Sequence, residues 1–294
     1  MFNLDAYLRA RRELVDAALD KHLPPEHTRP AILHRALRYS VLGGGKRIRP
    51  ILCIAAAEAV GGTPASALLP AAAIEILHTY TLVHDDLPAM DNDDLRRGRP
   101  TSHKTFGEAN AILAGDALLT LAFEWLAECK APAPYPPNQL ALELARAAGS
   151  QGVIGGQVED LAAEGKDPTA ALVDYIHRQK TAALVRAATR IGAISGGAKV
   201  AQLEALTNYG NDIGLAFQIG DDILNATSTH EVLGKGAGTD QERGKMTYVA
   251  VHGLDKARTH AQELVEKAVS ELRGAGITSE PLVAIARYVA DRKS

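Results

Sequence analysis

A run of charged side chains between His84 and Pro100 is the stretch of this sequence best suited to chemistry. Five carboxylates fall within ten residues and three arginines follow them: Asp85, Asp86, Asp91, Asp93, Asp94, Arg96, Arg97 and Arg99. Carboxylate oxygens hold hard cations such as Mg²⁺, with substrate phosphate filling the remaining positions. Guanidinium forks bind phosphate oxygens in pairs. The combination therefore predicts a site for a metal-bound polyanion.

A second acidic pair lies far downstream, at Asp221 and Asp222, in apolar surroundings with a helical period. Asp221 and Asn225 are four residues apart, so they share a helix face with Cβ atoms roughly 5–6 Å apart. Charged residues are rarely buried unless they are paired or bound to metal. The pair predicts a second acidic wall of the same site.

A basic loop, Gly43 to Arg49, is a further phosphate candidate, because its glycines expose backbone N–H groups and Lys46 and Arg49 supply charge. It is not a P-loop, since Arg47 follows Lys46 where that motif has Ser or Thr. On its own the loop fits a solvated basic surface better than a phosphate site.

The elements that must position these groups are predicted to be helices. Aromatic residues make up only 4% of the chain, and alternating, strand-like runs are scarce. Apolar residues recur at i, i+3, i+4 and i+7 in long windows. These windows are Leu4–Leu19, Ala31–Leu42, Ile48–Val60, Ala65–Asp86, Phe106–Cys129, Gln139–Leu161, Lys180–Ile194, Val200–Leu224, Leu254–Leu272 and Leu282–Ala290. We expect an all-α fold with helices around a central site; the antiparallel order of the helices around a cavity is implied only by the family resemblance described below.

Composition limits the class of protein. The chain of 294 residues carries a net charge of −3, so no overall basic field favours nucleic acid. The flanks of the proline-rich stretch 132–137 do not differ in composition, which favours a surface loop within one domain, 1–294. No apolar run reaches the roughly 18 residues of a membrane span. Cys53 and Cys129 have no metal or CxxC spacing. A cytoplasmic protein with free thiols is expected.

Taken in chain order, the motifs resemble the trans-type polyprenyl diphosphate synthases over almost the whole chain. The bacterial farnesyl and plastid-type geranylgeranyl diphosphate synthases are the nearest subgroup, since they carry two extra residues in the first Asp-rich motif. The matching residues are Gly-Gly-Lys-Arg-Ile-Arg-Pro ending at Pro50, Asp85 to Asp91, Leu95 to Gly98, Ala114 to Leu118, Gly155 to Gln157, Lys180-Thr181, Phe217-Gln218 with Asp221-Asp222, Leu233 to Lys235, and Gly244-Lys245.

The resemblance implies an isoprenoid-synthase-type bundle, usually a homodimer, that condenses isopentenyl diphosphate with an allylic diphosphate. About three Mg²⁺ ions would sit between two acidic walls, formed by Asp85, Asp86, Asp91, Asp221 and Asp222. The allylic diphosphate would contact Arg96, Lys180, Lys235 and Lys245. Isopentenyl diphosphate would contact Lys46, Arg49, His78 and Arg97.

The same resemblance implies how the reaction proceeds. The allylic C–O bond ionises, and metal and cationic side chains neutralise the departing diphosphate. Thr181 and Gln218 would face the reacting carbons, where uncharged dipoles stabilise the allylic cation without trapping it. The expelled diphosphate can take the proton, so no side-chain base is required.

Some residues in these motifs have plain structural interpretations. Asp93 and Asp94 are expected to be solvated or structural rather than metal ligands. Arg99 fits the surface and the site equally, and His78 would be a core histidine without the family resemblance. Asp116 and Gln157 could contact substrate directly or through another residue.

The chain departs from the family at Asn225, where a third Asp is usual, and at Val249, where Pro is usual. Asn keeps one carbonyl oxygen but loses the charge, which predicts weaker binding of one Mg²⁺.

Product length should depend on the helix that leads into Asp85. One turn rises about 5.4 Å, close to one isoprene unit, so Tyr80 and Thr81, with Leu77 and Ile74, are predicted to form the cavity floor. An aromatic residue at position 80 resembles the stop of farnesyl (C15) synthases. The segments 36–55 and 176–184 are nearer to the geranylgeranyl (C20) group. We expect farnesyl diphosphate, with geranylgeranyl diphosphate as the alternative.

Two rivals differ in class. A terpene cyclase would need Ser or Thr at position 225 and Glu at position 229, where this chain has Asn225 and Thr229. A non-catalytic subunit of a heteromeric synthase would tend to lose its Asp motifs, and most of both are present here.

Overall fold

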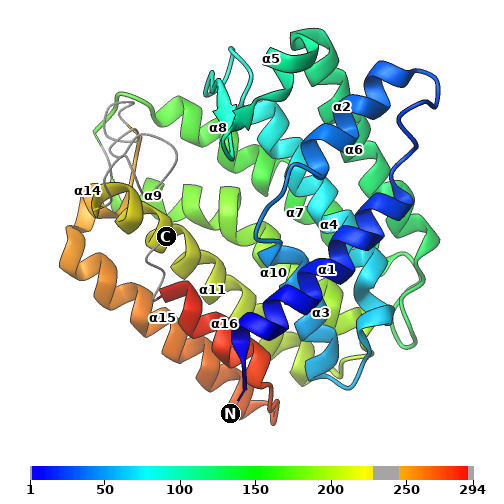
Figure 1. Ribbon diagram of the computed structural model, residues 1–294. Coiled ribbons are helices and arrows are strands. Elements are labelled where there is room, and N and C mark those ends of the chain that lie inside the picture. The colour runs from blue at the N-terminus through cyan, green and yellow to red at the C-terminus, as the bar shows by residue number, and fades with distance from the viewer. Residues whose placement is uncertain (1, 168, 228–244, 291–294) are drawn as a thin grey trace.

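Helices form almost all of the regular structure in the computed structural model, which describes residues 2–167, 169–227 and 245–290 (Figure 1). The helices are α1 (Leu4–His22), α2 (Ala31–Val41), α3 (Ile48–Ala59), α4 (Pro64–Asp85), α5 (Ser102–Phe106), α6 (Glu108–Glu128), α7 (Gln139–Ala148), α8 (Val153–Ala163), α9 (Ala170–Ile176), the π-helix η1 (His177–Ala182), α10 (Ala183–Ser195), α11 (Val200–Thr227), α14 (Tyr248–His252), α15 (Leu254–Gly274) and α16 (Glu280–Ala290). The expected all-α class is confirmed.

Within the described residues, the exception is a hairpin of two strands with two residues each. Strand β1 (Leu95–Arg96) pairs antiparallel with β2 (Arg99–Pro100), and positive φ angles at Arg97 and Gly98 make the turn. The sequence did not lead us to expect it, because two-residue strands are too short to show alternation.

Helix α4 packs against several other helices and ends in the first acidic motif. Thr63 caps it by accepting a hydrogen bond from Ser66 N, and Pro64 follows as its first residue. Its residues are apolar around most of the circumference because it packs against both α3 and α6. Helix α4 ends at Asp85, so the acidic residues that follow lie at the end of a core helix.

The middle of the chain differs from the predicted pattern in two places. The window Gln139–Leu161 is two helices rather than one, because Gly149 and Gly152 leave helical geometry between α7 and α8. The helix expected to begin at Lys180 begins at Ala170, where the Thr169 hydroxyl accepts from Leu172 N. Lys180 and Thr181 thus lie inside the π-helical segment, a geometry frequent at functional sites.

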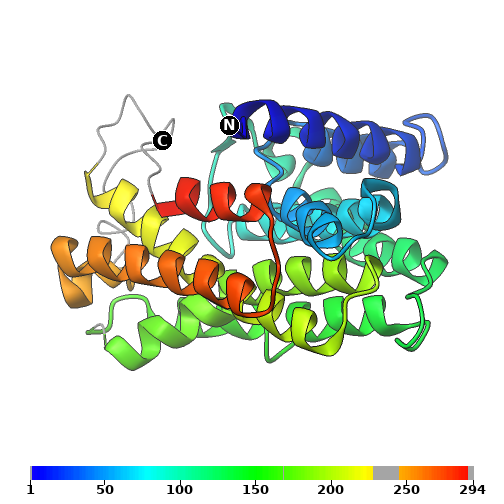
Figure 2. The same cartoon turned by 90° about the horizontal axis from the view of Figure 1, so that it is seen from below.

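The helices are stacked in layers, as the second view shows, with α1 (blue) on one outer face and green helices from the middle of the chain on the opposite face (Figure 2). One buried cluster joins α1, α2, α4, α6 and α7. A second joins α3, α11, α15 and α16. Helix α10 packs between the two clusters, against α4 and α7 of the first and against α3 and α11 of the second.

Two helices, α4 and α6, are long and apolar enough by composition to cross a membrane. In α4, 67% of the relevant window is buried within the protein, as expected for a core helix. The corresponding share for α6 is 39%, since part of its apolar face is exposed.

Candidate active site

Two adjoining cavities lie at the C-terminal end of α4. The first is polar, about 320 Å³, with walls from α4, α8, η1, α11 and the segment 245–247. The second is mostly apolar, about 590 Å³, with walls from α4, α6, α8 and η1. Both are lined by Leu82, Asp85, Lys180 and Thr181, so the two cavities meet at these side chains. The shape suits a ligand with an anionic head and an apolar chain.

One wall of the polar cavity is acidic. Asp85 and Asp91 both line it, and the Asp91 backbone N–H donates to the Asp85 carbonyl over 2.8 Å, which folds the loop back on the helix end. Burial raises the pKa of Asp85 to about 6 against the opposing charge of Lys180. A carboxylate in this setting would be stabilised by further positive charge.

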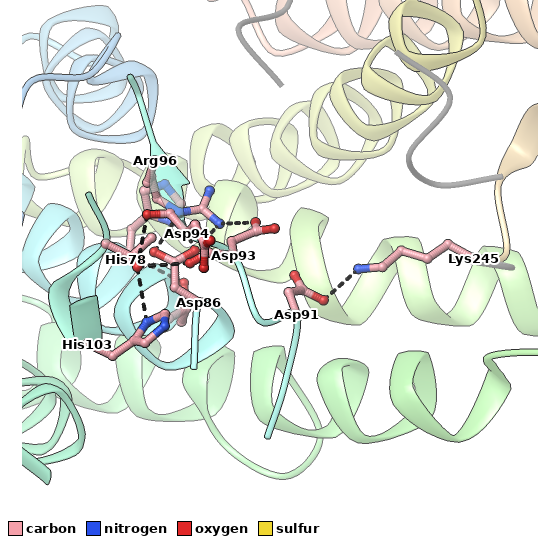
Figure 3. A network of polar contacts seen from close by, with 10 residues as sticks. His78, Asp86, Asp91, Asp93, Asp94, Arg96, His103 and Lys245 are labelled. Atoms are coloured by element: carbon pink, nitrogen blue, oxygen red, sulfur yellow. Dashed lines mark hydrogen bonds and ion pairs between the residues drawn. The ribbon is translucent and has the colours of Figure 1, made fainter. Parts of the chain in front are cut away.

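Asp86 points elsewhere. It is 3% exposed, and both its oxygens accept hydrogen bonds from Arg96 Nε, at 2.7 and 2.9 Å. Figure 3 shows Asp86 in a group with Arg96, Asp93 and Asp94, while Asp91 lies apart and is directed toward Lys245. The ion pair with Asp86 fixes Arg96, whose side chain also lines the polar cavity.

Lysines from two other elements reach the same cavity. Lys180 Nζ donates to Asp160 Oδ2 at 2.6 Å. Lys245 Nζ lies 2.9 Å from Asp91 and 4.0 Å from Asp160. Asp160, 8% exposed, thus joins the two lysines. Sequence analysis missed it, although Asp160 follows Gln157 by three residues, so both share a face of α8.

The opposite wall comes from α11. Gln218 Nε2 donates to Asp222 Oδ1 at 2.9 Å, and the Tyr248 backbone N–H donates to Asp222 Oδ2 at 2.6 Å. His177 Nε2 lies 3.3 Å from the same oxygen. Burial lowers the pKa of His177 to about 4, so the ring is neutral at pH 7. Among the described residues lining the polar cavity, Asp222 is present and its neighbour Asp221 is not.

The basic set, made up of Lys46, Arg49, His78 and Arg97, reaches the apolar cavity through two of its members. Arg49 Nη1 lies 3.3 Å from His78 Nε2, and both side chains line that cavity. Desolvation, with the nearby Arg49 guanidinium, lowers the pKa of His78 well below its usual value. The ring is therefore neutral and can accept from Arg49. Arg97 Nη1 donates to the Gly44 carbonyl, which brings the hairpin onto the loop that carries Lys46.

The floor of the apolar cavity contains Tyr80, 6% exposed, whose ring meets the His84 ring edge-on at 5.6 Å. His84 rests on Gly115 of α6, where a Cβ atom would lie 2.0 Å from the imidazole. Thr81 also lines the cavity, but its hydroxyl donates to the His78 carbonyl. Tyr80 of α4 is therefore held in place by His84, which packs against α6.

Close backbone packing brings α8 to the π-helix. A Cβ atom on Gly156 would lie 2.3 Å from the backbone nitrogen of Lys180. The adjacent Gln157 lines the apolar cavity. The Gly-Gly-Gln motif thus sets the separation of two cavity walls.

The remaining sequence candidates lie as follows. Asp93 is ion-paired with Arg96 and Asp94 with Lys104. Arg99 stacks over the Tyr39 ring, 4.2 Å from its centroid. Asp116 lines the apolar cavity, 3.9 Å from His84. Lys235 and Thr229 lie outside the described residues.

The donor set fits Mg²⁺ in its chemistry. Asp85, Asp91 and Asp222 present carboxylate oxygens from both walls of the polar cavity. Within the described residues no three acidic, His or Cys side chains are grouped closely enough to enclose an ion by themselves. Mg²⁺ does not require such a cage, since one or two carboxylates suffice when water and substrate phosphates complete the shell.

Comparison with known proteins points in one direction. Residues 30–276 match the family model described as polyprenyl synthetase. The chain is 46% identical over 297 residues to geranylgeranyl pyrophosphate synthase 7, chloroplastic, from Arabidopsis thaliana, covering 100% of this chain and 85% of the relative. It is 45% identical to the large subunit 1 of a heterodimeric geranylgeranyl pyrophosphate synthase from the same plant, covering 100% of this chain and 80% of that relative.

Solved structures agree. An FPP/GFPP synthase from Zymomonas mobilis superimposes with a TM-score of 0.85 at 39% identity, covering 98% of this chain and 99% of that one. A geranylgeranyl pyrophosphate synthetase from Pyrococcus horikoshii superimposes with a TM-score of 0.89 at 32% identity, covering 99% and 98% respectively.

Proposed function

The chain belongs to the polyprenyl synthetase family and is a short-chain prenyltransferase, and we propose that it makes geranylgeranyl diphosphate from isopentenyl diphosphate and allylic diphosphates. The observation that carries the proposal is the junction of the two cavities, where Asp85, Lys180 and Thr181 lie between a polar head-group site and an apolar channel. An allylic diphosphate has these two parts, and its reacting carbon lies between them.

The polar cavity is suited to ionising the allylic C–O bond. Lys180, Lys245 and Arg96 surround the space where the diphosphate would depart, and their charges would stabilise it as it leaves. Asp85 and Asp91, facing Asp222, would hold Mg²⁺, which when bound supplies further positive charge to that diphosphate. Catalysis then depends on side chains whose interactions strengthen as charge separates.

Thr181 and Gln218 lie where the allylic cation would form. The Thr181 hydroxyl bonds to the Gln218 side-chain oxygen over 2.8 Å, so both present dipoles without a full charge. The double bond of isopentenyl diphosphate, held by Lys46, Arg49, His78 and Arg97, attacks the cation. The proton then lost passes to the expelled diphosphate.

The C20 product is supported by the names of the curated relatives, which are geranylgeranyl pyrophosphate synthases at 43–46% identity. The apolar cavity, about 590 Å³, is lined by Leu119 and Leu161 as well as by Tyr80, and its volume lies within the range usual for ligand pockets. A C15 product is the second candidate, favoured by the bulk of Tyr80 beside the channel. The comparisons support C20 better than the C15 product expected from the sequence.

Product sizing separates the candidates. The purified chain is incubated with Mg²⁺, isopentenyl diphosphate and either dimethylallyl, geranyl or farnesyl diphosphate. We expect a C20 product from each starter. Accumulation of C15 with no use of the farnesyl starter would favour the second candidate. Hydrocarbon release from farnesyl diphosphate alone would favour a cyclase, and an inactive purified chain would favour a subunit that needs a partner.

We also propose that residues 1–294 act as one polyprenyl synthase domain, as a cytoplasmic homodimer. Exposed apolar side chains on α6 and α8 support the dimer: Ile112, Leu113, Ile154 and Val158. Cys53 and Cys129 are unpaired, as a reducing compartment would keep them. Sedimentation of the purified chain tests the dimer, since a single species at monomer mass contradicts it.

A further inference from the structure

Arg47 lies between two residues of the basic set, Lys46 and Arg49, but its side chain does not join them. It is 3% exposed, whereas Lys46 is exposed and Arg49 is half-buried at the cavity. A guanidinium buried to this extent needs partners for its donors, because an unpaired buried charge is strongly destabilising.

The Arg47 guanidinium has such partners from three separate elements. Nε donates to Asp16 of α1 at 2.8 Å, Nη1 donates to Glu75 of α4 at 2.7 Å, and Nη2 donates to the Val41 carbonyl at the end of α2 at 2.7 Å. Glu75 is itself 2% exposed. One planar fork thus ties α1, α2 and α4 to the loop before α3.

The backbone of Arg47 gives a second observation. Its φ and ψ angles are 53° and 33°, in the left-handed region, and it immediately precedes α3. A residue with a Cβ atom adopts this conformation at a cost, so the surrounding contacts must impose it. The conformation directs the backbone from Lys46 into the first turn of α3, where Arg49 lies.

The ion pair between Arg47 and Glu75 also lies near His78 of the basic set. Glu75 precedes His78 by three residues on α4, so the two are about one helical turn apart. His78 in turn lies 3.3 Å from Arg49. Arg47 therefore links the loop of Lys46, the first turn of α3 and the α4 turn that carries His78.

We propose that Arg47, through Glu75, is a positioning residue that holds Lys46, Arg49 and His78 in register to bind the diphosphate of isopentenyl diphosphate. This inference rests on the proposed function, which assigns that substrate to these three side chains and Arg97. Arg47 itself touches no substrate. Its loss would therefore weaken binding of isopentenyl diphosphate selectively, because the two lysines of the allylic site, Lys180 on η1 and Lys245, come from segments that Arg47 does not contact.

The test compares Glu75→Gln and Arg47→Lys with the wild-type chain. Glu75→Gln keeps the shape but removes the charge, and Arg47→Lys keeps the charge but removes the fork. Small displacements of binding groups have large effects, so we expect the Kd of isopentenyl diphosphate, measured calorimetrically without added metal, to rise about tenfold. Its KM should rise in parallel, while the KM of the allylic substrate changes by less than about twofold.

Glu58→Gln is the matched control. Glu58 pairs with Arg11 and accepts from Tyr7, joining α1 to α3 at a part-buried site away from the cavities. It should lower the thermal midpoint without changing either KM. If Glu75→Gln does not fold, Asp16→Asn tests the same fork at its more exposed end. Folded Glu75→Gln or Asp16→Asn with Kd and KM for isopentenyl diphosphate at wild-type values would overturn the positioning role.

The two proposals fail separately. A wild-type chain that gives no product with any starter contradicts the proposed function, and the calorimetric Kd still reports on positioning. Normal wild-type turnover, with an allylic KM that rises as much as that of isopentenyl diphosphate, contradicts the selective role of Arg47 alone.

Discussion

Thr181 donates its hydroxyl proton to the side-chain oxygen of Gln218 over 2.8 Å, which joins the π-helix to α11 across the polar cavity. The Gln218 amide nitrogen donates to Asp222, so the orientation of this amide is fixed from both ends. The family resemblance implies that both groups face the reacting carbons. The structure shows in addition that Asp222 fixes the Gln218 amide.

Tyr80→Ala tests the chain-length role of the cavity floor. Removing the Tyr80 ring enlarges the apolar cavity. We therefore expect products at least one isoprene unit longer than those of the wild-type chain. Chromatographic sizing of products from the farnesyl starter measures this. Tyr175→Ala, on the exposed face of α9, is the control. An unchanged product distribution in Tyr80→Ala would remove Tyr80 from this role.

Asn225→Asp tests the departure in the second acidic motif. Asn225 lies on α11 one turn after Asp221, and a carboxylate there adds charge to the acidic wall. The Mg²⁺ concentration that gives half-maximal rate should fall several-fold, and chelation should inactivate both proteins. Asn211→Asp, earlier on the same helix, controls for charge alone. An unchanged or higher Mg²⁺ requirement would contradict the prediction.

Asp160→Asn tests the carboxylate that sequence analysis missed. Its loss removes the 2.6 Å charge-assisted contact that holds Lys180, and charged hydrogen bonds of this kind contribute about 1.5–3 kcal/mol. We expect kcat/KM for the allylic substrate to fall by about tenfold to a hundredfold in steady-state assays. Glu159→Gln, exposed on the same helix, is the control, and equal effects of the two would refute a specific role.

Gly115→Ala tests the contact under His84. The new methyl group would meet the imidazole, so we expect a loss of about 1–3 kcal/mol in the free energy of unfolding, measured with denaturant. In the double variant with His84→Ala the space is free, and much of that loss should be recovered. Additive losses in the double variant would show that His84 is not the obstacle.

His78→Gln tests the neutral imidazole that lines the apolar cavity beside Arg49. The folded protein keeps this ring unprotonated, whereas the unfolded chain protonates it below about pH 6.5. The unfolded state therefore binds the extra proton, and stability falls as pH drops below 6.5. Unfolding at pH 7.5 and 5.5 should show a smaller acid loss for His78→Gln than for wild type. His27→Gln, at an exposed position, is the control.

Helical periodicity predicted the class and most helices, because long amphipathic windows carry a strong signal. It failed at Gln139–Leu161, since the apolar period continues through Gly149 and Gly152 although the backbone does not. It also placed the start of a helix at Lys180 rather than Ala170. A period read from side chains does not distinguish a π turn from an α turn.

The sequence also could not predict which carboxylates of the acidic motifs line the polar cavity. The family resemblance implied one metal site for Asp85, Asp86, Asp91, Asp221 and Asp222, and three of these, Asp85, Asp91 and Asp222, line the polar cavity. Only the fold shows that Asp86 is taken up by Arg96. Asp160 carried no recognised motif of its own, and its role depends on Lys180, 20 residues later in the chain.

The contact between Gly156 and the Lys180 backbone has a consequence for how the site can vary. Helix α8 and the π-helix pack this closely because Gly156 has no Cβ atom. A methyl group at Gly156 would push α8 and the π-helix apart. The cavity between them would widen, and Asp160 would move away from Lys180. The separation of these two cavity walls thus depends on a glycine that lines neither cavity.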